Sequence, residues 1–318
     1  MTKVKTAVLV EKRRFEICDR KLEIQPDEVL IKIAVCGLCN WELNHFNGIL
    51  GEFPMTLGHE WAGEIVEKGK DVKNLKVGDK VAVLPDTLEG FAEYGVAKEK
   101  NCFLVNPDID VKKVLLEPLK CIVTVLRAAA PEAGDFGVIM GCGPMGLWCI
   151  QAMGRMLNAG IAAVDVDDRK LELAQKYGAS CVINGKRDDV EEKIKEMTKG
   201  HMADFVIEGT GRGEVLAQAA GLLRNGQGRL ALMSYHSDKV KEFDFRLFSD
   251  KAIKLLNPHP AYSPDPLDDA RRAMELINRK VFQQEHIITH RFRLEEIQKA
   301  FETLENKPTD YVKGVVYM

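Results

Sequence analysis

The sequence of 318 residues has neither a long hydrophobic run nor an excess of charge of one sign. No stretch approaches the roughly 18 uninterrupted apolar residues of a membrane-spanning helix, and the N-terminal residues are too charged for a secretory signal. Lys and Arg number 45 against 48 Asp and Glu, so the formal net charge is −3, and no basic run offers a footprint for nucleic acid. We expect a cytoplasmic protein without membrane or nucleic-acid partners.

Cysteine is also sparse. Eight cysteines in 318 residues are too dispersed for a disulfide framework, so we expect thiols or metal ligands. Cys36 and Cys39 form the one C-x-x-C pair, and no thioredoxin-like context surrounds it. With 46% apolar and 29% charged residues, the composition is ordinary for a globular protein, and about 150 residues per domain suggests two domains.

The chain has two parts with different sequence patterns. Residues 1 to about 118 contain short β segments separated by turns rich in Gly, Pro and Asp, which predicts a mostly antiparallel β unit. After Pro118, apolar strands alternate with amphipathic helices, which is typical of an α/β fold with a doubly wound parallel sheet. Five strands are predicted there, over 136–140, 160–165, 181–184, 203–208 and 229–233. The tail returns to mixed character, with helices expected over 266–279 and 294–306.

A glycine-rich turn follows the first of these strands. Gly141, Gly143 and Gly146 stand in G-x-G-x-x-G register, and an amphipathic helix begins at once. Such glycines allow the tight turn, the close approach of a pyrophosphate and the packing of helix against strand, while the helix N-terminus attracts phosphate. The pattern predicts a dinucleotide site, and the alternative is a turn with no ligand.

An acidic residue supports the dinucleotide interpretation. Asp165 ends the next predicted strand, 24 residues after Gly141, where a carboxylate can accept hydrogen bonds from the adenosine ribose. Because it would repel a 2′-phosphate, we expect NAD rather than NADP, although Arg169 and Lys170 lie close behind. The alternative role of Asp165 is to cap the following helix.

The N-terminal half contains residue types that bind zinc. Cys39 and His59 lie 20 residues apart in two different predicted loops. A thiolate and an imidazole suit Zn²⁺, and a nearby carboxylate would complete three protein ligands while leaving one position open. Taken singly, each residue could equally be a buried thiol or a core imidazole.

In order and spacing together, the motifs resemble the zinc-dependent medium-chain dehydrogenases and reductases, the superfamily of alcohol, sorbitol and threonine dehydrogenases. The resemblance spans nearly the whole chain, and it implies a GroES-like catalytic domain of residues 1–118 and 257–318 with a Rossmann NAD-binding domain of residues 119–256. Its markers are C-G-L-C at 36–39, G-H-E at 58–60, V-G-D-K-V at 77–81, G-F-A-E-Y at 90–94, E-P-L at 117–119, G-C-G-P-M-G at 141–146 and I-T-H-R-F at 288–292.

The resemblance implies a set of metal-site residues. Cys39 and His59 are similar to catalytic zinc ligands, with Glu60 or Glu117 as the third. At the position of Glu117 many alcohol dehydrogenases have a cysteine. A glutamate there is typical of the polyol dehydrogenase branch. Glu42 resembles the acid, usually an aspartate, that orients the zinc-bound histidine through its far ring nitrogen.

The chain departs from the family pattern in two places. No lobe of four closely spaced cysteines lies between Asp79 and Phe91, so we expect one catalytic zinc and no structural zinc. Trp41 and Asn44 stand where relatives have a hydroxyl residue and a histidine that pass the alcohol proton outward. Neither side chain is a general base near neutral pH, so Trp41 is expected to form a wall of the substrate site.

The resemblance also implies the cofactor contacts. The pyrophosphate would lie on the glycine turn and near Lys313, and loops near 209–211 and 233–235 would hold the nicotinamide. His45 and His259 could line a pocket, although isolated loop histidines are more often simply solvated. The expected cofactor-binding residues are Gly141, Gly143, Pro144, Met145, Gly146, Asp165, Lys170, Gly209, Thr210, Met233, Ser234 and Lys313.

These observations predict an NAD-dependent zinc dehydrogenase, with small-molecule substrates, that converts a secondary alcohol of a polyol or sugar-like compound reversibly to the ketone. By resemblance we expect a homodimer or homotetramer. One alternative is a zinc-independent reductase of activated double bonds in quinones or enones, against which Cys39, His59 and Glu117 argue. The other is a cofactor-binding protein without catalysis, which the missing relay at Trp41 favours.

Overall fold

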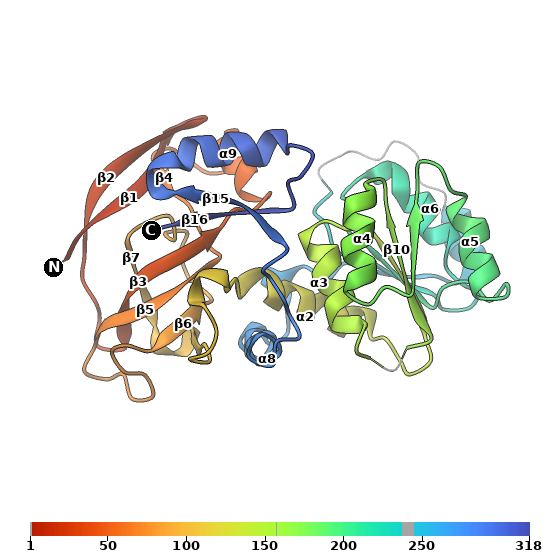
Figure 1. The fold of residues 1–318 in the computed structure, drawn as a ribbon, viewed down its shortest axis with the longest axis horizontal. Helices are drawn as coiled ribbons and strands as arrows, with labels where there is room; N and C mark the ends of the chain where they lie inside the picture. The colour runs from red at the N-terminus through yellow and green to blue at the C-terminus, as the bar shows by residue number, and fades with distance from the viewer. Residues whose placement is uncertain (1, 157, 237–244) are drawn as a thin grey trace. The chain divides into compact units, whose positions relative to one another are not determined.

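The chain forms two compact units in the computed structural model, which describes residues 2–156, 158–236 and 245–318 (Figure 1). The first unit combines Met1–Lys120 with Ala270–Met318, and the second comprises Cys121–Asp269. None of the helices in the described stretches has the length and apolar character needed to cross a membrane.

The chain enters the second unit near the expected residue 118 but leaves it later than the expected 257. One reason is that Arg127 forms ion pairs with Asp268 and Asp269, which ties the segment just before Ala270 to the second unit. This division therefore places residues 257–269 in the second unit.

The first unit contains two mostly antiparallel sheets, as the sequence predicts. Its strands are β1 (Thr2–Glu11), β2 (Arg14–Leu22), β3 (Glu28–Gly37), β4 (Met55–Thr56), β5 (Trp61–Lys68), β6 (Lys80–Val83), β7 (Tyr94–Lys98), β8 (Cys102–Leu104), β15 (Ile288–Arg293) and β16 (Lys313–Tyr317). The smaller sheet has the order β2-β1-β4, and the larger has the order β15-β16-β3-β5-β6-β8 with β7 also paired to β3. The β15 and β16 strands are parallel to each other.

Amphipathic patterns explain how this unit packs. Helix α9 (Ile297–Asn306) buries Ile297, Ala300, Phe301 and Leu304, the three- and four-residue spacing of one helix face. The Phe301 ring packs 4.8 Å from that of Phe15. Its remaining helices are α1 (Glu42–Phe46) and the short helices η1 (Glu99–Asn101), η2 (Val111–Lys113) and η5 (Leu294–Glu296), while α2 (Glu117–Ala129) and α8 (Pro266–Asn278) cross the boundary between the units.

The second unit is a doubly wound parallel sheet of the order β11-β10-β9-β12-β13-β14. Numbered within the unit, this order is 3-2-1-4-5-6, the arrangement typical of dinucleotide-binding domains. Its elements are β9 (Phe136–Met140), α3 (Pro144–Met153), β10 (Gly160–Asp165), α4 (Asp168–Lys176), β11 (Cys181–Asn184), α5 (Val190–Met197), β12 (Phe205–Glu208), η3 (Gly213–Val215), α6 (Leu216–Gly221), β13 (Arg229–Leu232), α7 (Phe245–Lys251), β14 (Lys254–Leu256) and η4 (Pro260–Tyr262).

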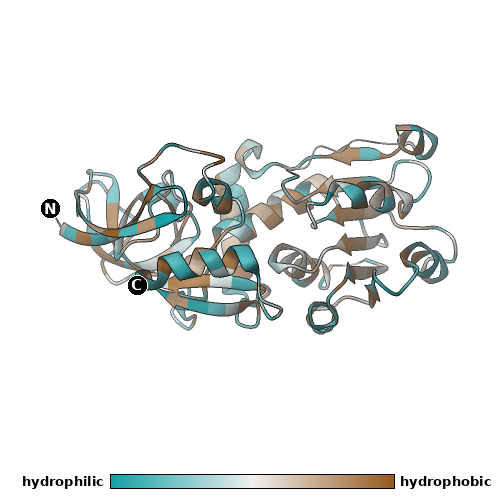
Figure 2. Cartoon of the chain, turned by 90° about the horizontal axis from the view of Figure 1, so that it is seen from above, coloured by the Kyte–Doolittle hydropathy of each residue, from teal (hydrophilic) through white to brown (hydrophobic). Residues whose placement is uncertain are grey.

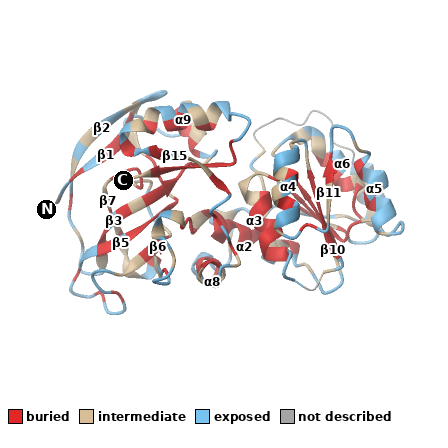
Figure 3. Cartoon of the chain, viewed as in Figure 1, coloured by how far each residue is buried: buried red, intermediate tan, exposed pale blue. Residues whose placement is uncertain are grey.

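The prediction of five strands in this sheet is wrong by one, because β14 adds a sixth, parallel to β13. The three residues of β14 are exposed or half-buried, so they lack the apolar run by which a buried parallel strand is recognised. Elsewhere the strands are buried and the helices expose one face, as expected for a sheet covered by amphipathic helices. Figure 3 shows buried residues along the strands and exposed residues on the outer sides of α4 and α5. Figure 2 shows hydrophobic residues concentrated on the strands.

Candidate active site

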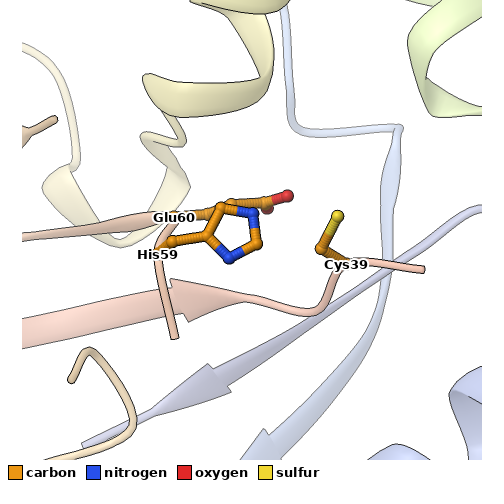
Figure 4. A group of neighbouring side chains, drawn as sticks. All are labelled: Cys39, His59 and Glu60. Carbon is orange, nitrogen blue, oxygen red and sulfur yellow. The ribbon is translucent and has the colours of Figure 1, made fainter. Parts of the chain in front are cut away.

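Cys39, His59 and Glu60 form a compact group with metal-binding chemistry (Figure 4). The antiparallel pairing of β3 with β5 sets Cys36 opposite Trp61, which brings the residues just after β3 beside those just before β5. One ligand atom from each of the three side chains lies within 4.8 Å of the others. Sulfur, imidazole nitrogen and carboxylate oxygen are suitable donors for Zn²⁺, so the residues present fit this ion.

Glu42 orients His59. Its Oε1 lies 2.9 Å from His59 Nδ1 and accepts a 2.7 Å hydrogen bond from the Gly58 backbone N–H. Because a carboxylate accepts, Nδ1 carries the hydrogen and Nε2 presents its lone pair to a metal. Glu42 therefore lies against the ring nitrogen of His59 that faces away from the metal-binding group, and its side chain, longer than that of an aspartate, still reaches the ring.

The same pair controls the charge of His59. Burial lowers its pKa, but the charge of Glu42 and hydrogen bonds with Cys39 and Glu42 outweigh burial and hold the pKa well above the usual value. Metal binding requires a neutral imidazole, so a metal ion must displace this proton.

Glu60 is held by a buried lysine from the other end of the chain. Lys313 Nζ lies 2.6 Å from Glu60 Oε2, and it donates to Glu60 Oε1 and to the Leu38 carbonyl, each at 2.9 Å. Burial lowers the pKa of Lys313, but the charges of Glu60 and Cys39 raise it above its usual value. The expectation that Lys313 contacts the cofactor pyrophosphate is not supported by this placement, because its ammonium is buried in the ion pair.

Glu117 lies at the edge of the metal-binding group. Its Oε2 is 3.9 Å from His59 Nε2, the nitrogen available to a metal, and its Oε1 is 3.5 Å from Lys120 Nζ. Both Glu60 and Glu117 therefore remain candidates for the third ligand. Sequence reasoning missed Lys120, although its place three residues after Glu117 on a helix is a spacing that brings two side chains together.

The charges around the group match a divalent cation. Four groups are anionic when the thiol is ionised, and two buried ammoniums compensate half of that charge. With His59 neutral, as metal binding requires, two negative charges are left in a partly buried setting, where uncompensated charge is costly and a dication is the natural complement. The anions are Cys39, Glu42, Glu60 and Glu117, and the cations are Lys120 and Lys313.

An aromatic side chain borders the histidine ligand. Trp41 is 39% exposed, and its ring stands edge-on to the rings of His59 and His45 at 5.6 Å and 4.6 Å. Exposed apolar area beside a metal-binding group supports the interpretation of Trp41 as a substrate wall.

The expectation that His45 and His259 are simply solvated fails for His45. His45 is buried, its Nδ1 donates to the Leu50 carbonyl at 3.1 Å, and its Nε2 has no hydrogen-bond partner among the described residues. Burial lowers the pKa of His45, which favours the neutral ring. His259 instead accepts a hydrogen bond from the Ala261 N–H at the start of η4.

In the second unit, the glycine turn has the geometry that its sequence predicts. Gly141 has φ of 93°, in the region that favours glycine. Gly143 precedes α3, which begins with Pro144 and Met145, and an added Cβ at Gly143 would meet nothing within 4 Å. At Gly146 a Cβ would lie 1.9 Å from the Gly141 carbonyl oxygen, so only glycine allows this close packing.

Asp165 stabilises the glycine turn by accepting backbone hydrogen bonds. Its Oδ2 accepts the Cys142 N–H at 2.7 Å, and its Oδ1 accepts the N–H groups of Val166 and Asp167 at 2.7 and 3.0 Å. A carboxylate offers about four acceptor sites, so one is left for a ribose hydroxyl. The guanidinium of Arg169 forms an ion pair with Asp167 at 3.1 Å.

The remaining predicted cofactor residues meet at the carboxyl ends of two strands. Gly209 and Thr210 follow β12, while Met233 and Ser234 follow β13 and donate their N–H groups to the Glu208 carbonyl at 2.8 and 3.3 Å. The Gly209 N–H bonds the Met140 carbonyl at 2.7 Å, beside the glycine turn. Lys170 lies in the first turn of α4, the helix that follows Asp165 in the chain.

Comparisons with known proteins agree with this arrangement. A family model described as "Alcohol dehydrogenase GroES-like domain" matches residues 25–107, and one described as "Zinc-binding dehydrogenase" matches residues 144–277. Sorbitol dehydrogenase of Bacillus subtilis (strain 168) is 27% identical over 348 residues, covering 99% of this chain and 97% of that protein. (R,R)-butanediol dehydrogenase of the same strain is 32% identical over 232 residues, covering 61% and 67%.

The fold has close structural neighbours. The crystal structure of galactitol-1-phosphate dehydrogenase from Escherichia coli matches with a TM-score of 0.89, covering 99% of this chain and 100% of that chain. At 24% sequence identity this likeness concerns the fold alone.

Proposed function

Since this chain belongs to the zinc-dependent medium-chain dehydrogenase and reductase superfamily, we propose that it oxidises a secondary alcohol of a polyol or sugar-like substrate reversibly to the ketone with NAD. The observation that carries the proposal is the group of Cys39, His59 and Glu60 beside the exposed Trp41. A metal-ligand set next to an accessible aromatic side chain suits a hydroxyl compound whose C–H groups can pack against the indole.

Each residue of the site has a part in this reaction. Cys39 and His59, with Glu60 or Glu117, would hold Zn²⁺, which when bound would act as a Lewis acid toward the substrate hydroxyl. Glu42 keeps His59 in the ligating tautomer. Trp41 would pack against the substrate, and the glycine turn with Asp165 would hold the dinucleotide, which would accept the hydride.

The test is a metal analysis together with a substrate screen. We expect about one zinc per chain and NADH formation with at least one polyol or other secondary alcohol, lost on chelation and restored by Zn²⁺. A metal-free protein that oxidises NADH or NADPH with an enone or quinone would contradict the proposal. Glu60→Gln and Glu117→Gln identify the third ligand, because the variant that removes a ligand binds less zinc and turns over more slowly.

The cofactor is proposed to be NAD with a preference over NADP of at least about tenfold, equivalent to about 1.4 kcal/mol. The carboxylate of Asp165 repels a 2′-phosphate, and Arg169 is already paired with Asp167. Equal kcat/KM with the two cofactors would show that a cation nearby recruits the phosphate.

We also propose that the protein is a cytoplasmic homodimer or homotetramer. The family resemblance supports this assembly. Light scattering at several protein concentrations tests it, and a monomer mass throughout would contradict it.

A further inference from the structure

An arginine in the turn between β1 and β2 connects three segments that lie far apart in the sequence. Arg13 has a φ of 63°, a backbone conformation that glycine adopts more readily and that other residues keep only where their contacts compensate for it. Its guanidinium donates two parallel hydrogen bonds to Glu305 of α9, at 2.8 and 2.6 Å, and a third to Asn47 Oδ1 at 2.7 Å. Asn47 Nδ2 donates to Glu305 Oε1 at 3.1 Å, which closes the Arg13 network of Arg13, Asn47 and Glu305. Gln298, also on α9, donates to the Arg13 carbonyl at 3.0 Å.

The Arg13 network holds the C-terminal end of α1. Asn47 directly follows this helix, and the Arg13 backbone N–H donates to the carbonyl of Phe46, its last residue, at 2.9 Å. The guanidinium also lies over the Phe46 ring, 5.0 Å from the centroid. Phe46 is completely buried and packs against the rings of Phe15 and Phe301. Polar contacts and aromatic packing therefore fix the same end of the helix.

The opposite end of α1 belongs to the metal-binding group. Glu42, the first residue of the helix, orients His59, and its own N–H donates to the Cys39 carbonyl at 3.1 Å. Trp41 comes immediately before the helix. Glu42 and Phe46 are four residues apart, so they lie on one buried face, about 6 Å apart along the axis. Since a single helical turn has little stability of its own, a displacement of one end is expected to move the other.

The geometry of the Arg13 network sets it apart from an ordinary surface ion pair. An exposed pair usually contributes little, except where an arginine binds a carboxylate through two N–H groups or where several groups act together. Both conditions are met here, and the side chains of Arg13 and Glu305 are 42% and 30% exposed. The planar guanidinium supplies donors to two partners at once, which a point charge could not do with the same geometry.

We propose that Arg13 is a positioning residue of the metal site. It fixes α1, the helix that presents Glu42 to His59 and that Trp41 precedes. Loss of the guanidinium should therefore loosen this helix, weaken zinc binding and give solvent more access to Trp41. The inference rests on the proposed function for the identity of the metal, but its measurements do not require an alcohol substrate.

The first test measures zinc affinity by competition with a chromophoric chelator, in the full-length protein and well below the Tm. Arg13→Gln removes the guanidinium, and Asn47→Ala breaks the contact between the Arg13 side chain and the end of the helix. We expect the Kd for zinc to rise at least about threefold in both variants, within the range by which residues of a packed network change binding. A role in overall stability alone would lower the Tm but leave this Kd unchanged, because nearly all molecules stay folded at the temperature of the measurement.

A second readout needs neither metal nor substrate. Trp61 and Trp148 are 2% and 0% exposed, whereas Trp41 is 39% exposed, so acrylamide quenches mainly the fluorescence of Trp41. Quenching of the metal-free Arg13→Gln and Asn47→Ala proteins should be stronger than that of the metal-free wild type. This measurement reports on the segment before α1 directly.

The neighbouring arginine provides a matched control. Arg14 lies in the same hairpin and forms ion pairs with Glu11 and Glu16, at 2.8 and 3.2 Å. Arg14→Gln makes the same change of charge one position away, and it should keep the wild-type zinc affinity and quenching. Differential scanning fluorimetry shows which variants are folded, and Asn47→Ala carries the test if Arg13→Gln does not fold.

The outcomes distinguish this role from the proposed function. Zinc affinity or quenching that stays at the wild-type value in both variants, or an equal change in Arg14→Gln, would overturn the positioning role even if polyols are oxidised. Weaker zinc binding with stronger quenching in the two variants, and no change in Arg14→Gln, supports the role even if no alcohol is oxidised. In that case the proposed function fails alone.

Discussion

At the scale of single residues, the metal site depends on side chains that do not point at the metal. Glu42 fixes the tautomer of His59, and Lys313 compensates the charge of Glu60. Removing one member of such a buried pair leaves its partner without compensation, which costs more than the pair contributes. Variants of these supporting residues are therefore informative about the site.

The first prediction concerns Glu42→Gln. The amide oxygen can still accept from His59 Nδ1 and Gly58, but the negative charge that makes the imidazole a better ligand is lost. We expect zinc affinity to fall about 10- to 100-fold, measured by competition with a chromophoric chelator. Glu64→Gln makes the same change at an exposed position of β5 and should leave affinity unchanged. Wild-type affinity in Glu42→Gln would show that the carboxylate only positions the backbone.

The second prediction concerns Trp41→Ser. An indole offers about 200 Å² of contact area, so its removal should raise KM for the best polyol about tenfold without raising kcat. Steady-state kinetics provide the measurement, and Tyr262→Ser, at a side chain that is 84% exposed, is the control. If Trp41→Ser instead turned over simple alcohols faster and left polyol oxidation unchanged, Trp41 would be a steric plug and not a stacking surface.

At the scale of elements, close approach of backbone segments determines which positions tolerate a side chain. The glycine motif that leads from β9 into α3 includes two glycines with opposite surroundings. Gly146 packs against the Gly141 carbonyl, whereas the Cβ direction of Gly143 is open. The same substitution should therefore separate folding from binding.

We predict that Gly146→Ala lowers the Tm and abolishes NADH binding, because backbone must move to admit the methyl group, at a cost of about 1–3 kcal/mol. Gly143→Ala should keep the wild-type Tm, since its φ of −68° suits alanine, but bind NADH more weakly because the Cβ obstructs the pyrophosphate. Differential scanning fluorimetry and NADH titration test both. A stable Gly146→Ala, or a Gly143→Ala with wild-type affinity, would contradict these roles.

The start of α4 has a pH-dependent contact. Arg187 and then Asn184 hydrogen-bond Asp168 and lower its pKa from 3.8 to about 2. A carboxyl whose folded pKa is depressed stabilises the fold above its unfolded pKa, and this contribution disappears as the pH falls from about 4 to about 2. Asp168→Asn should therefore lower the Tm at neutral pH, and this effect should shrink as the pH approaches about 2 and vanish below it. Because the pair is exposed, added salt should reduce the difference, and a constant difference across pH would contradict the assignment.

At the scale of the whole molecule, the two units have separate hydrophobic cores. All candidate metal ligands belong to the first unit, while the glycine turn and the loops after β12 and β13 belong to the second. Each ligand should therefore stabilise mainly the unit that binds it.

We predict that chelation of zinc abolishes alcohol oxidation but leaves the Kd for NADH within about twofold of the holoenzyme value, below the 5- to 150-fold changes typical of coupled sites. NADH titration before and after chelation is the measurement, with zinc re-addition as the control for reversibility. Loss of NADH binding together with zinc would show that the metal also organises the dinucleotide-binding unit.

Local motifs made much of this architecture predictable. Strand, glycine turn and helix follow one another within a few residues, so the dinucleotide turn at Gly141 to Gly146 could be predicted without tertiary information. The same holds for the antiparallel first unit, where short alternating segments are separated by turns. The metal-binding residue types at Cys39 and His59 were recognisable as well, because the family motifs around them are contiguous.

The sequence by itself determined these local features and the two-part plan of the chain, whereas the tertiary structure decided how distant side chains combine. Pairing of β16 with β3 sets Val316 opposite Cys36 and so brings Lys313 to Glu60, 253 positions away. The burial of His45, the strand β14 and the contact of Arg13 with Glu305 likewise depend on register and packing. A short motif specifies its own backbone, but no local pattern specifies which strand will lie beside it, because that choice is made by the packing of the whole core.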